Sequence, residues 1–392
     1  MNIALLSLPS NFHCRKWAKG LRRAGANVCV YSFEDGDAGT GIQTVKIPPP
    51  LAFHKRYFYP CYELTGKKLL RELKARRTDV LHPLHATPFG TWAVKTGFRP
   101  TVVAAIGADI FDFSPQPPPV QWQQNAAFLS AAKRNLLRPF YRKRVLAALN
   151  FADKITADNQ ALCNAIVEGF GVKNEKIELL RWGVDPDMFE DNREADAKIN
   201  ELLRPLSPPV VVVPRGLKPI YRANVILQAL DRWLSKERET EGGFVLMTAG
   251  YSPDPQLYFR AKRLQAAHPN RVVLIDEQLN EREMGALWKR TDGFVSAPVY
   301  DGYSAAVAEG RYVGAVPIVD DSEAVKEWYD GENALVVAPF NAENLSKTLE
   351  VFIQNGPRLR QRFAPRNRKW ITEHSLLSSS SRRFLKLCET LL

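Results

Sequence analysis

The chain has 392 residues, 45% of them hydrophobic and 24% charged, which is typical of a soluble globular protein with room for two domains of ordinary size. No stretch reaches the roughly 18 to 20 uninterrupted apolar residues of a membrane-spanning helix, and the first apolar run lacks a basic leader, so we expect a buried first strand and a cytoplasmic protein. The net charge of +12 lies entirely in residues 1–180, which hold 25 Lys and Arg against 13 Asp and Glu, whereas residues 181–392 hold 29 of each.

The first 150 residues alternate strand-like and helix-like segments, a pattern that indicates β-α-β units and a parallel sheet. Five cysteines are scattered and odd in number, which argues against a disulfide framework and against a zinc site. The predicted elements are, in order, strand 2–8, helix 15–24, strand 27–32, helix 63–77, strand 79–82, strand 101–106 and a long helical region 120–149.

The alternation restarts at residue 152 and continues to the end of the chain. The four valines at 210–213 predict a strand that is buried on both faces, and residues 206–209 look like a linker before it. We therefore predict two doubly wound α/β domains, 1–205 and 206–365, followed by helices at 366–392. The other predicted elements are strand 154–157, helix 159–170 and strands 177–180, 244–249, 272–275, 293–297, 315–319 and 335–337.

The segment 290–337 is the most informative, because strand 293–297 runs through a polar loop into a helix whose first turn is expected to hold Gly302, Tyr303 and Ser304. A first helical turn has unpaired N–H groups and a positive dipole end, which suit a phosphate. Asp301 and Glu309 frame that turn with seven residues between them, so Glu309 is expected two turns along the helix while Asp301 stays in the loop. The alternative is an ordinary strand-loop-helix edge with incidental acids.

The pattern Ser-x-Pro-x-x-Asp-Gly, a Glu after seven further residues, then Gly and Pro-Ile-Val-x-Asp, resembles the donor site of the retaining GT-B glycosyltransferases (glycosyl transferases group 1). Glycogen synthases, sucrose-phosphate synthases and bacterial polysaccharide transferases share that signature. The resemblance implies that Glu309 holds the ribose hydroxyls, that Asp301 faces the sugar ring, and that the N–H groups of Gly302, Tyr303 and Ser304 cradle the diphosphate. It also implies two Rossmann-like domains facing a central cleft, a terminal helix that returns to the first domain, and no metal or other cofactor.

Two cations are expected at the diphosphate, because negative charge develops on the leaving group as the glycosidic bond breaks. In the family an Arg and a Lys follow the first strand of the second domain, commonly with Gly after the Lys. Arg215 matches the Arg, but no Lys-Gly pair follows it. Lys218 and Arg222 are therefore alternatives for the second cation, and each is also open to interpretation as a solvated surface charge.

Two loops of the first half resemble the acceptor side of the family. His82 and His85 end a strand at its C-terminal edge, where open α/β sheets bind ligands, although a lone His is more often structural. Ile106 replaces the His of the family's His-Gly-x-Asp loop, so the prediction rests on Gly107 and Asp109, with Asp109 counted as catalytic together with Asp301 and Arg215. The first strand ends in Pro-Ser-Asn where many relatives have Gly-Gly, which indicates an unusual acceptor or a looser loop.

Basic pairs alternate with aromatic residues in the first half. Such segments suit an anionic membrane surface, and a lipid-linked acceptor would explain why only this half is basic. A solvated basic face is the alternative, and nucleic acid is not expected because no recognition motif accompanies the charge. The residues are Lys55, Arg56, Lys67, Lys68, Arg76, Arg77, Arg142, Lys143 and Arg144, beside Phe53, Tyr57, Phe58, Tyr59, Phe140 and Tyr141.

The function predicted from these features is metal-independent, retaining transfer of a hexose from a nucleotide-sugar to a glycan or lipid-linked glycan. The pathway expected is cell-surface polysaccharide or lipopolysaccharide synthesis, with the enzyme cytoplasmic or peripheral on the inner face of the membrane. Two alternatives stay open at this point. One is a GT-B protein that binds a nucleotide-sugar or glycan without turnover, and the other is an epimerase on the same fold.

Overall fold

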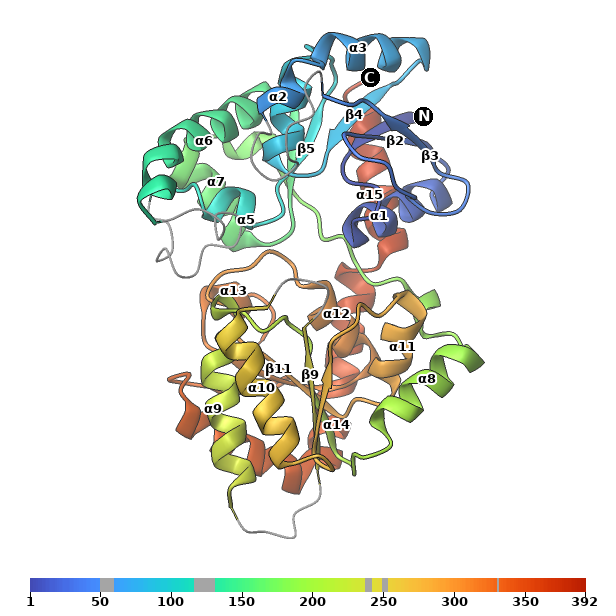
Figure 1. The fold of residues 1–392 in the computed structure, drawn as a ribbon. Coiled ribbons are helices and arrows are strands. Elements are labelled where there is room, and N and C mark those ends of the chain that lie inside the picture. Colours follow the sequence, from blue (N-terminus) through green and yellow to red (C-terminus); the bar gives the residue numbers. More distant parts are fainter. Residues whose placement is uncertain (50–59, 116–130, 237–241, 249–252, 330) are drawn as a thin grey trace. The chain divides into compact units, whose positions relative to one another are not determined.

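The structure is a computed structural model that describes residues 1–49, 60–115, 131–236, 242–248, 253–329 and 331–392. These residues form two compact units, which are coloured by sequence in Figure 1. The first unit contains Met1–Trp182 and Leu377–Leu392, and the second contains Gly183–Leu376. The basic and aromatic residues expected at 53–59 lie outside the described residues.

The first unit is built on parallel strands, as the alternating pattern predicts. A four-stranded sheet, in the order β3-β2-β1-β4, meets a three-stranded sheet, in the order β5-β6-β7, through bridges from Leu81 to Thr101 and from Leu84 to Ala104. The strands are β1 (Asn2–Leu6), β2 (Asn27–Ser32), β3 (Gln43–Lys46), β4 (Val80–Pro83), β5 (Val102–Ala104), β6 (Lys154–Ala157) and β7 (Ile177–Leu179). Strand β3 was not predicted, because it is an edge strand whose exposed and half-buried residues give no pattern of alternating apolar positions.

Helices cover these strands. The long helix predicted at 120–149 is described from Ala131 onward and tolerates Pro139 in its interior. The helices are α1 (Phe12–Arg23), α2 (Pro60–Glu63), α3 (Gly66–Ala75), the π-helix Ala86–Gly90, α4 (Thr91–Val94), α5 (Ala108–Phe111), α6 (Ala131–Phe151), α7 (Gln160–Phe170) and α15 (Leu377–Glu389).

The C-terminal helix α15 completes the core of the first unit and lies beside α1 (Figure 1). Trp17 of α1 packs edge-on against Phe384 of α15 with 5.5 Å between ring centroids, and it stacks on Trp182 at 5.6 Å. A Cβ added at Gly20 would lie 2.6 Å from the Ser381 Oγ atom, so the absence of a side chain there lets the two helices approach closely.

The second unit has a six-stranded parallel sheet in the order β10-β9-β8-β11-β12-β13. Val211 and Val213 of β8 pack into one hydrophobic cluster, whereas Val210 and Val212 pack into another, which confirms that this strand is buried on both faces. The strands are β8 (Val210–Val213), β9 (Gly243–Met247), β10 (Val272–Ile275), β11 (Gly293–Ser296), β12 (Val316–Asp320) and β13 (Leu335–Val337).

Hydrophobic clusters on the two faces of this sheet hold the helices of the second unit. One cluster joins the sheet to α9, α10 and α14, and the others join it to α8, α11 and α12. The helices are α8 (Arg193–Leu203), α9 (Ala223–Leu234), α10 (Pro255–Ala267), α11 (Glu281–Lys289), α12 (Ala305–Val313), α13 (Glu323–Lys326) and α14 (Ala342–His374), with short 3₁₀ helices at Pro186–Phe189 and Pro219–Tyr221.

The division between the units falls at Trp182–Gly183 and Leu376–Leu377, whereas the sequence placed the domain boundaries at 205 and 365. Helix α8 belongs to the second unit because Ile199 and its apolar neighbours pack into the cluster that contains β8. The Val184 N–H donates to the Ser375 carbonyl at 2.8 Å, so the two segments that lead out of the second unit pair with each other. A linker-like composition at 206–209 could not show on which sheet the preceding helix packs.

Candidate functional site

The strand order of the second unit places a topological switch point between β8 and β11. From β8 the chain winds outward through β9 and β10, and it then returns to the other side of β8 to form β11. Open parallel sheets bind ligands at the carboxyl ends of the strands at such a point, because the loops diverge there. Arg215 follows β8 and Asp301 follows β11, so the residues predicted from the donor motif meet at this edge of the sheet.

Arg215 joins the two loops. Its guanidinium forms an ion pair with the Asp301 carboxylate at 2.7 Å and donates to the Ser304 Oγ atom at 2.7 Å. The guanidinium also lies over the Tyr221 ring, 4.3 Å from its centroid, a cation–π contact that holds it in place. The loop after β8 is therefore tied to the loop that opens α12.

Asp301 is a partly buried acid held beside a cation. Burial raises the pKa of its carboxyl group, while the charge of Arg215 and the N–H of Gly302 act in the opposite direction. The charge of Arg215 thus offsets part of the effect of burial on the pKa of this carboxyl group. A group of this kind can orient and polarise a bound ligand without being a strong nucleophile.

Helix α12 begins later than predicted. Ser304 is its N-cap residue, with its Oγ atom accepting from the Val307 N–H, so Gly302, Tyr303 and Ser304 lie before the first turn and not within it. The donors of the helix end come from residues that directly follow Ser304, beginning with Ala305. The Tyr303 ring packs 4.4 Å from Trp328, and its hydroxyl is hydrogen-bonded to Ser375, so only the backbone of Tyr303 faces away from the core.

Glu309 lies one turn into α12, counted from Ala305, and not two turns as predicted, because the helix starts later. Its side chain is only 3% exposed, and its Oε2 atom accepts a hydrogen bond from the Trp288 indole at 3.3 Å. Trp288 is on α11, and no motif in the sequence pointed to it.

The two alternatives for the second cation have different surroundings. Arg222 forms an ion pair at 2.7 Å with Asp320, whose side chain is fully buried at the end of β12. Lys218 has a lowered pKa, first because of burial and second because the charge of Arg215 is near. Arg222 is thus engaged by Asp320, whereas Lys218 has the charge of Arg215 near it, so Lys218 stays the more suitable candidate for the second cation.

His82 lies in the core of the first unit, contrary to its predicted place on the acceptor side. Its side chain is fully buried, with its Nδ1 atom 2.5 Å from the Val102 carbonyl oxygen and its ring 4.3 Å from Phe384 of α15. Full burial leaves no surface for contact with a substrate. Strand β4 is interior, so a residue at its end faces the helix that covers the sheet, which the local sequence could not show.

Burial lowers the pKa of His82 to about 4, below the ordinary value of 6.5, and this has a consequence for acid stability. The unfolded chain takes up a proton at this side chain near pH 6.5, whereas the folded chain does not. The contribution of His82 to the free energy of unfolding is therefore complete above pH 6.5 and is lost as the pH falls toward 4. We expect this residue to account for about 2 kcal/mol of the unfolding free energy lost between pH 7.5 and pH 5.

Urea unfolding of the protein and of His82→Leu at both pH values measures this contribution. The variant should show a shallower pH dependence, and His374→Leu, at an exposed position, should keep the original one. Equal pH dependence in His82→Leu and the unsubstituted chain would show that His82 is not held neutral.

Asp109 is buried and joins two loops of the first unit. Its carboxylate is 1% exposed and accepts N–H bonds from Ala86 at 2.7 Å and from Ile106 and Gly107 at 3.0 Å. Gly107 has a φ of 124°, which a residue with a side chain rarely adopts. The acceptor capacity of Asp109, which the sequence analysis counted as catalytic, thus serves the backbone of two loops in this structure.

His85 is better placed for function than His82. It follows β4 with a positive φ of 90°, is half-buried, and has its Nδ1 atom 2.5 Å from the Leu84 carbonyl oxygen. Strained backbone of this kind persists where the surrounding structure enforces it, and it is common at binding sites. The acceptor-side role of His85 and of the Gly107 backbone stays a prediction.

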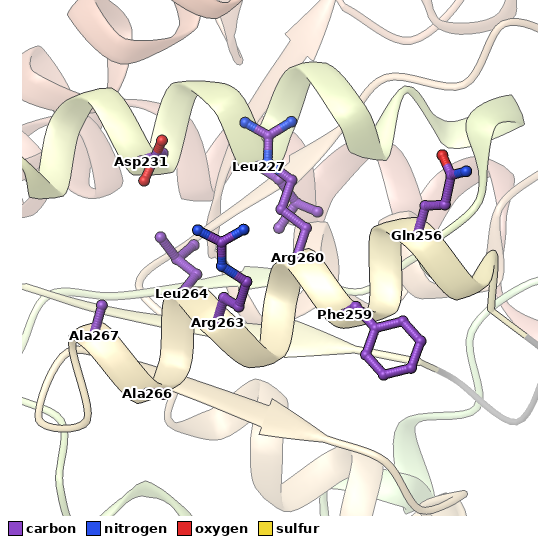
Figure 2. Close-up of a pocket in the computed structure, with 9 residues that line it drawn as sticks. All are labelled: Leu227, Asp231, Gln256, Phe259, Arg260, Arg263, Leu264, Ala266 and Ala267. Carbon is purple, nitrogen blue, oxygen red and sulfur yellow. The ribbon is translucent and has the colours of Figure 1, made fainter.

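The structure also has a groove that no motif predicted. It lies between α9 and α10 of the second unit, and none of the predicted site residues line it. Figure 2 shows the side chains of Arg260 and Arg263 directed into the space between the two helices, with Phe259 turned outward. The groove is therefore separate from the residues gathered at the carboxyl ends of β8 and β11.

Among the described residues, no three His, Cys, Asp or Glu side chains gather closely enough to hold a metal ion. The same part of the chain contains no helix with the length and apolar character needed to cross a membrane.

Comparison with known proteins agrees with the fold. Residues 2–159 match the glycosyl transferase 4-like family. Solved structures that resemble the whole chain include sucrose-phosphate synthase from Thermosynechococcus elongatus (TM-score 0.76, 15% identity, 100% of this chain and 99% of that one) and Anabaena HepE in complex with UDP-glucose (0.73, 16%, 100% of each). A third is WaaG, a glycosyltransferase involved in lipopolysaccharide biosynthesis (0.68, 13%, 100% and 99%).

Among curated proteins, none matches this sequence. The solved structures nevertheless resemble the chain from end to end. The predicted GT-B fold is therefore confirmed, and residues 2–159 are similar to the glycosyl transferase 4-like family.

Proposed function

We propose that the protein transfers a hexose, with retention of anomeric configuration, from a nucleotide-sugar to a glycan or lipid-linked glycan of a cell-surface polysaccharide or lipopolysaccharide. The observation that carries the proposal is the group formed by Arg215, Asp301 and Ser304 at the switch point of the second sheet. Cations, a partly buried carboxylate and a helix N-terminus meet there, which suits a sugar diphosphate.

The chemistry follows from the charges. As the bond between the sugar C1 atom and the diphosphate oxygen breaks, negative charge grows on the diphosphate, and Arg215 and Lys218 stabilise that charge. The acceptor oxygen bonds to C1 from the same side, and its proton passes to the departing phosphate oxygen, so no protein nucleophile is needed. Asp301 orients the sugar, and Glu309 binds the ribose hydroxyls. The second unit supplies these groups without a metal.

The relatives support the donor class. HepE is described in complex with UDP-glucose, and WaaG is described as acting in lipopolysaccharide biosynthesis. At 13 to 16% identity these likenesses show the fold, and a panel of donors identifies the base and the sugar.

Hydrolysis of a panel of UDP-, GDP- and ADP-sugars by the purified protein tests the proposal. We expect slow release of one nucleoside diphosphate that disappears in Glu309→Ala and persists in Glu323→Ala, which removes an exposed acid of the same unit. Tight binding without any turnover would instead identify a non-catalytic binding protein. Conversion of the donor into its epimer without release of the nucleotide would identify an epimerase.

We also propose that the first unit docks on an anionic membrane. Four of the exposed large hydrophobic side chains of the described residues belong to α6 and the end of α2, namely Leu64 (71% exposed), Leu136 (79%), Leu137 (37%) and Phe140 (47%). Glu63 and Arg144 form an ion pair that joins α2 to α6, so these side chains share one region. Lys67, Lys68 and Lys143 lie beside them in the sequence, and a basic and apolar surface of this kind suits a lipid interface.

The double variant Leu136→Asp, Phe140→Asp should reduce co-sedimentation with vesicles that contain phosphatidylserine. We expect the partition coefficient to fall at least about tenfold, because the variant removes two inserting side chains and adds two negative charges. Phe259→Asp, which alters an exposed ring of the second unit, should leave it unchanged. Binding of the double variant equal to that of the unsubstituted chain, or binding that does not weaken in high salt, would count against docking by this surface.

A further inference from the structure

The site's two acids have different kinds of partner. Asp301 pairs with the charged guanidinium of Arg215, whereas Glu309 accepts from the neutral indole N–H of Trp288. An indole N–H fixes the direction of a carboxylate without cancelling its charge, since it is a donor only and carries no net charge. The indole hydrogen bond by itself therefore orients the carboxylate and does not neutralise it.

Trp288 reaches this carboxylate because of a glycine. A Cβ added at Gly310 would lie 2.8 Å from the Trp288 Cζ3 atom and 2.9 Å from the Phe294 ring, so the indole lies directly against α12 at that position. Trp288 is fully buried, and its ring meets the Phe294 ring edge-on with 5.6 Å between centroids. Contacts on both sides thus hold the indole N–H at Glu309, the residue before the glycine.

We propose that Trp288 is a positioning residue that aims the Glu309 carboxylate at the ribose of the bound nucleotide, an inference that rests on the proposed function. A carboxylate that is already fixed loses little side-chain freedom when it binds the ribose hydroxyls. Loss of the indole N–H should therefore weaken recognition of the ribose in particular, and not the binding of phosphates by Arg215 and Lys218.

Calorimetric binding of a nucleoside diphosphate and of its 2′-deoxy form tests this. The probe is whichever of UDP, GDP, ADP and CDP binds the unsubstituted chain most tightly. In Trp288→Phe, which keeps a ring but removes the donor, we expect the ribonucleotide to bind about tenfold more weakly and the deoxynucleotide to change less than about twofold. The preference for the ribonucleotide then largely disappears.

Trp233→Phe is the matched control, because it shortens a buried tryptophan in another hydrophobic cluster of the same unit and should leave the preference unchanged. Glu309→Gln should lower the preference, and adding Trp288→Phe to it should have little further effect if the indole acts through Glu309. If Trp288→Phe does not fold, Gly310→Ala displaces the indole without removing it and should give the same loss of preference.

The outcomes separate the two proposals. If the unsubstituted chain binds a nucleotide and Trp288→Phe keeps the full preference for ribose, the positioning role is wrong and the proposed function stands. If the preference survives in the folded Gly310→Ala variant as well, the indole has no part in ribose recognition. If the unsubstituted chain binds none of the four nucleotides, the proposed function fails and this inference fails with it.

Discussion

Replacing Arg215 with alanine should lower the rate of donor turnover about a hundredfold, by analogy with the loss of a single charge-stabilising donor in other enzymes. Arg215 is expected to act on the charge that develops on the diphosphate, so the change should appear mainly in kcat and less in KM. Steady-state hydrolysis or transfer with the donor found in the panel measures it. Arg215→Lys should lose less, since it keeps the charge but not the paired hydrogen bonds to Asp301 and Ser304.

Arg215 also compensates a partly buried acid, and the controls must separate that effect from catalysis. Without Arg215, only the N–H of Gly302 would oppose the effect of burial, and the pKa of the Asp301 carboxyl group would rise further. The double variant Arg215→Ala, Asp301→Asn removes this unpaired acid, so it should regain stability but not rate. Arg263→Ala, at an exposed position in the same unit, should keep full activity. A rate within threefold of the original in Arg215→Ala would contradict the proposed role.

Gly285→Ala should destabilise the second unit by about 3 kcal/mol, a large fraction of the stability of an ordinary domain. A Cβ at this position of α11 would lie 1.9 Å from the Met188 carbonyl oxygen, a backbone atom that cannot rotate away. The higher helix propensity of alanine contributes at most about 1 kcal/mol in the other direction, so the clash decides the sign. Urea unfolding followed by far-UV circular dichroism measures the difference.

Gly356→Ala is the matched control for this prediction. Gly356 is also inside a helix of the second unit, but the nearest atom to an added Cβ is 3.6 Å away on the Phe352 ring, an ordinary contact. This substitution should be neutral or stabilising by up to about 1 kcal/mol, because only the gain in helix propensity remains. Equal changes in the free energy of unfolding for the two substitutions would mean that α11 does not pack closely against the segment around Met188.

The elements of both sheets could be predicted from the sequence to within a few residues, because buried parallel strands are short apolar runs bounded by loops. The four valines of β8 are an example, since their burial on both faces was evident from the run itself. The edge strand β3 could not be found in this way, because its residues are exposed or half-buried. The sequence analysis placed the start of α12 too early. Glycine and serine are both common at the start of a helix, so residue type did not show that Ser304 is the N-cap residue and that Gly302 precedes the helix.

The candidate site was predictable only in part. Arg215 and Asp301 could be placed together, because residues that follow neighbouring parallel strands meet at one edge of the sheet. The partners of the other charged residues could not be predicted. Asp320, which binds Arg222, is 98 positions away, and the Trp288 indole that binds Glu309 is on a different helix. His82 and Asp109 looked like site residues by type, but burial and backbone hydrogen bonds use their polar groups within the first unit.

The amino-acid sequence by itself determined the order of strands and helices and the loops at the carboxyl ends of β8 and β11, because hydrophobic period and turn residues act over a few neighbours. Only the tertiary structure decided which acid each cation binds, which histidine is buried, and where the chain passes from one unit to the other. Those features depend on contacts between residues far apart in the chain, whose energies are set by burial and by the atoms brought near after the sheets have formed.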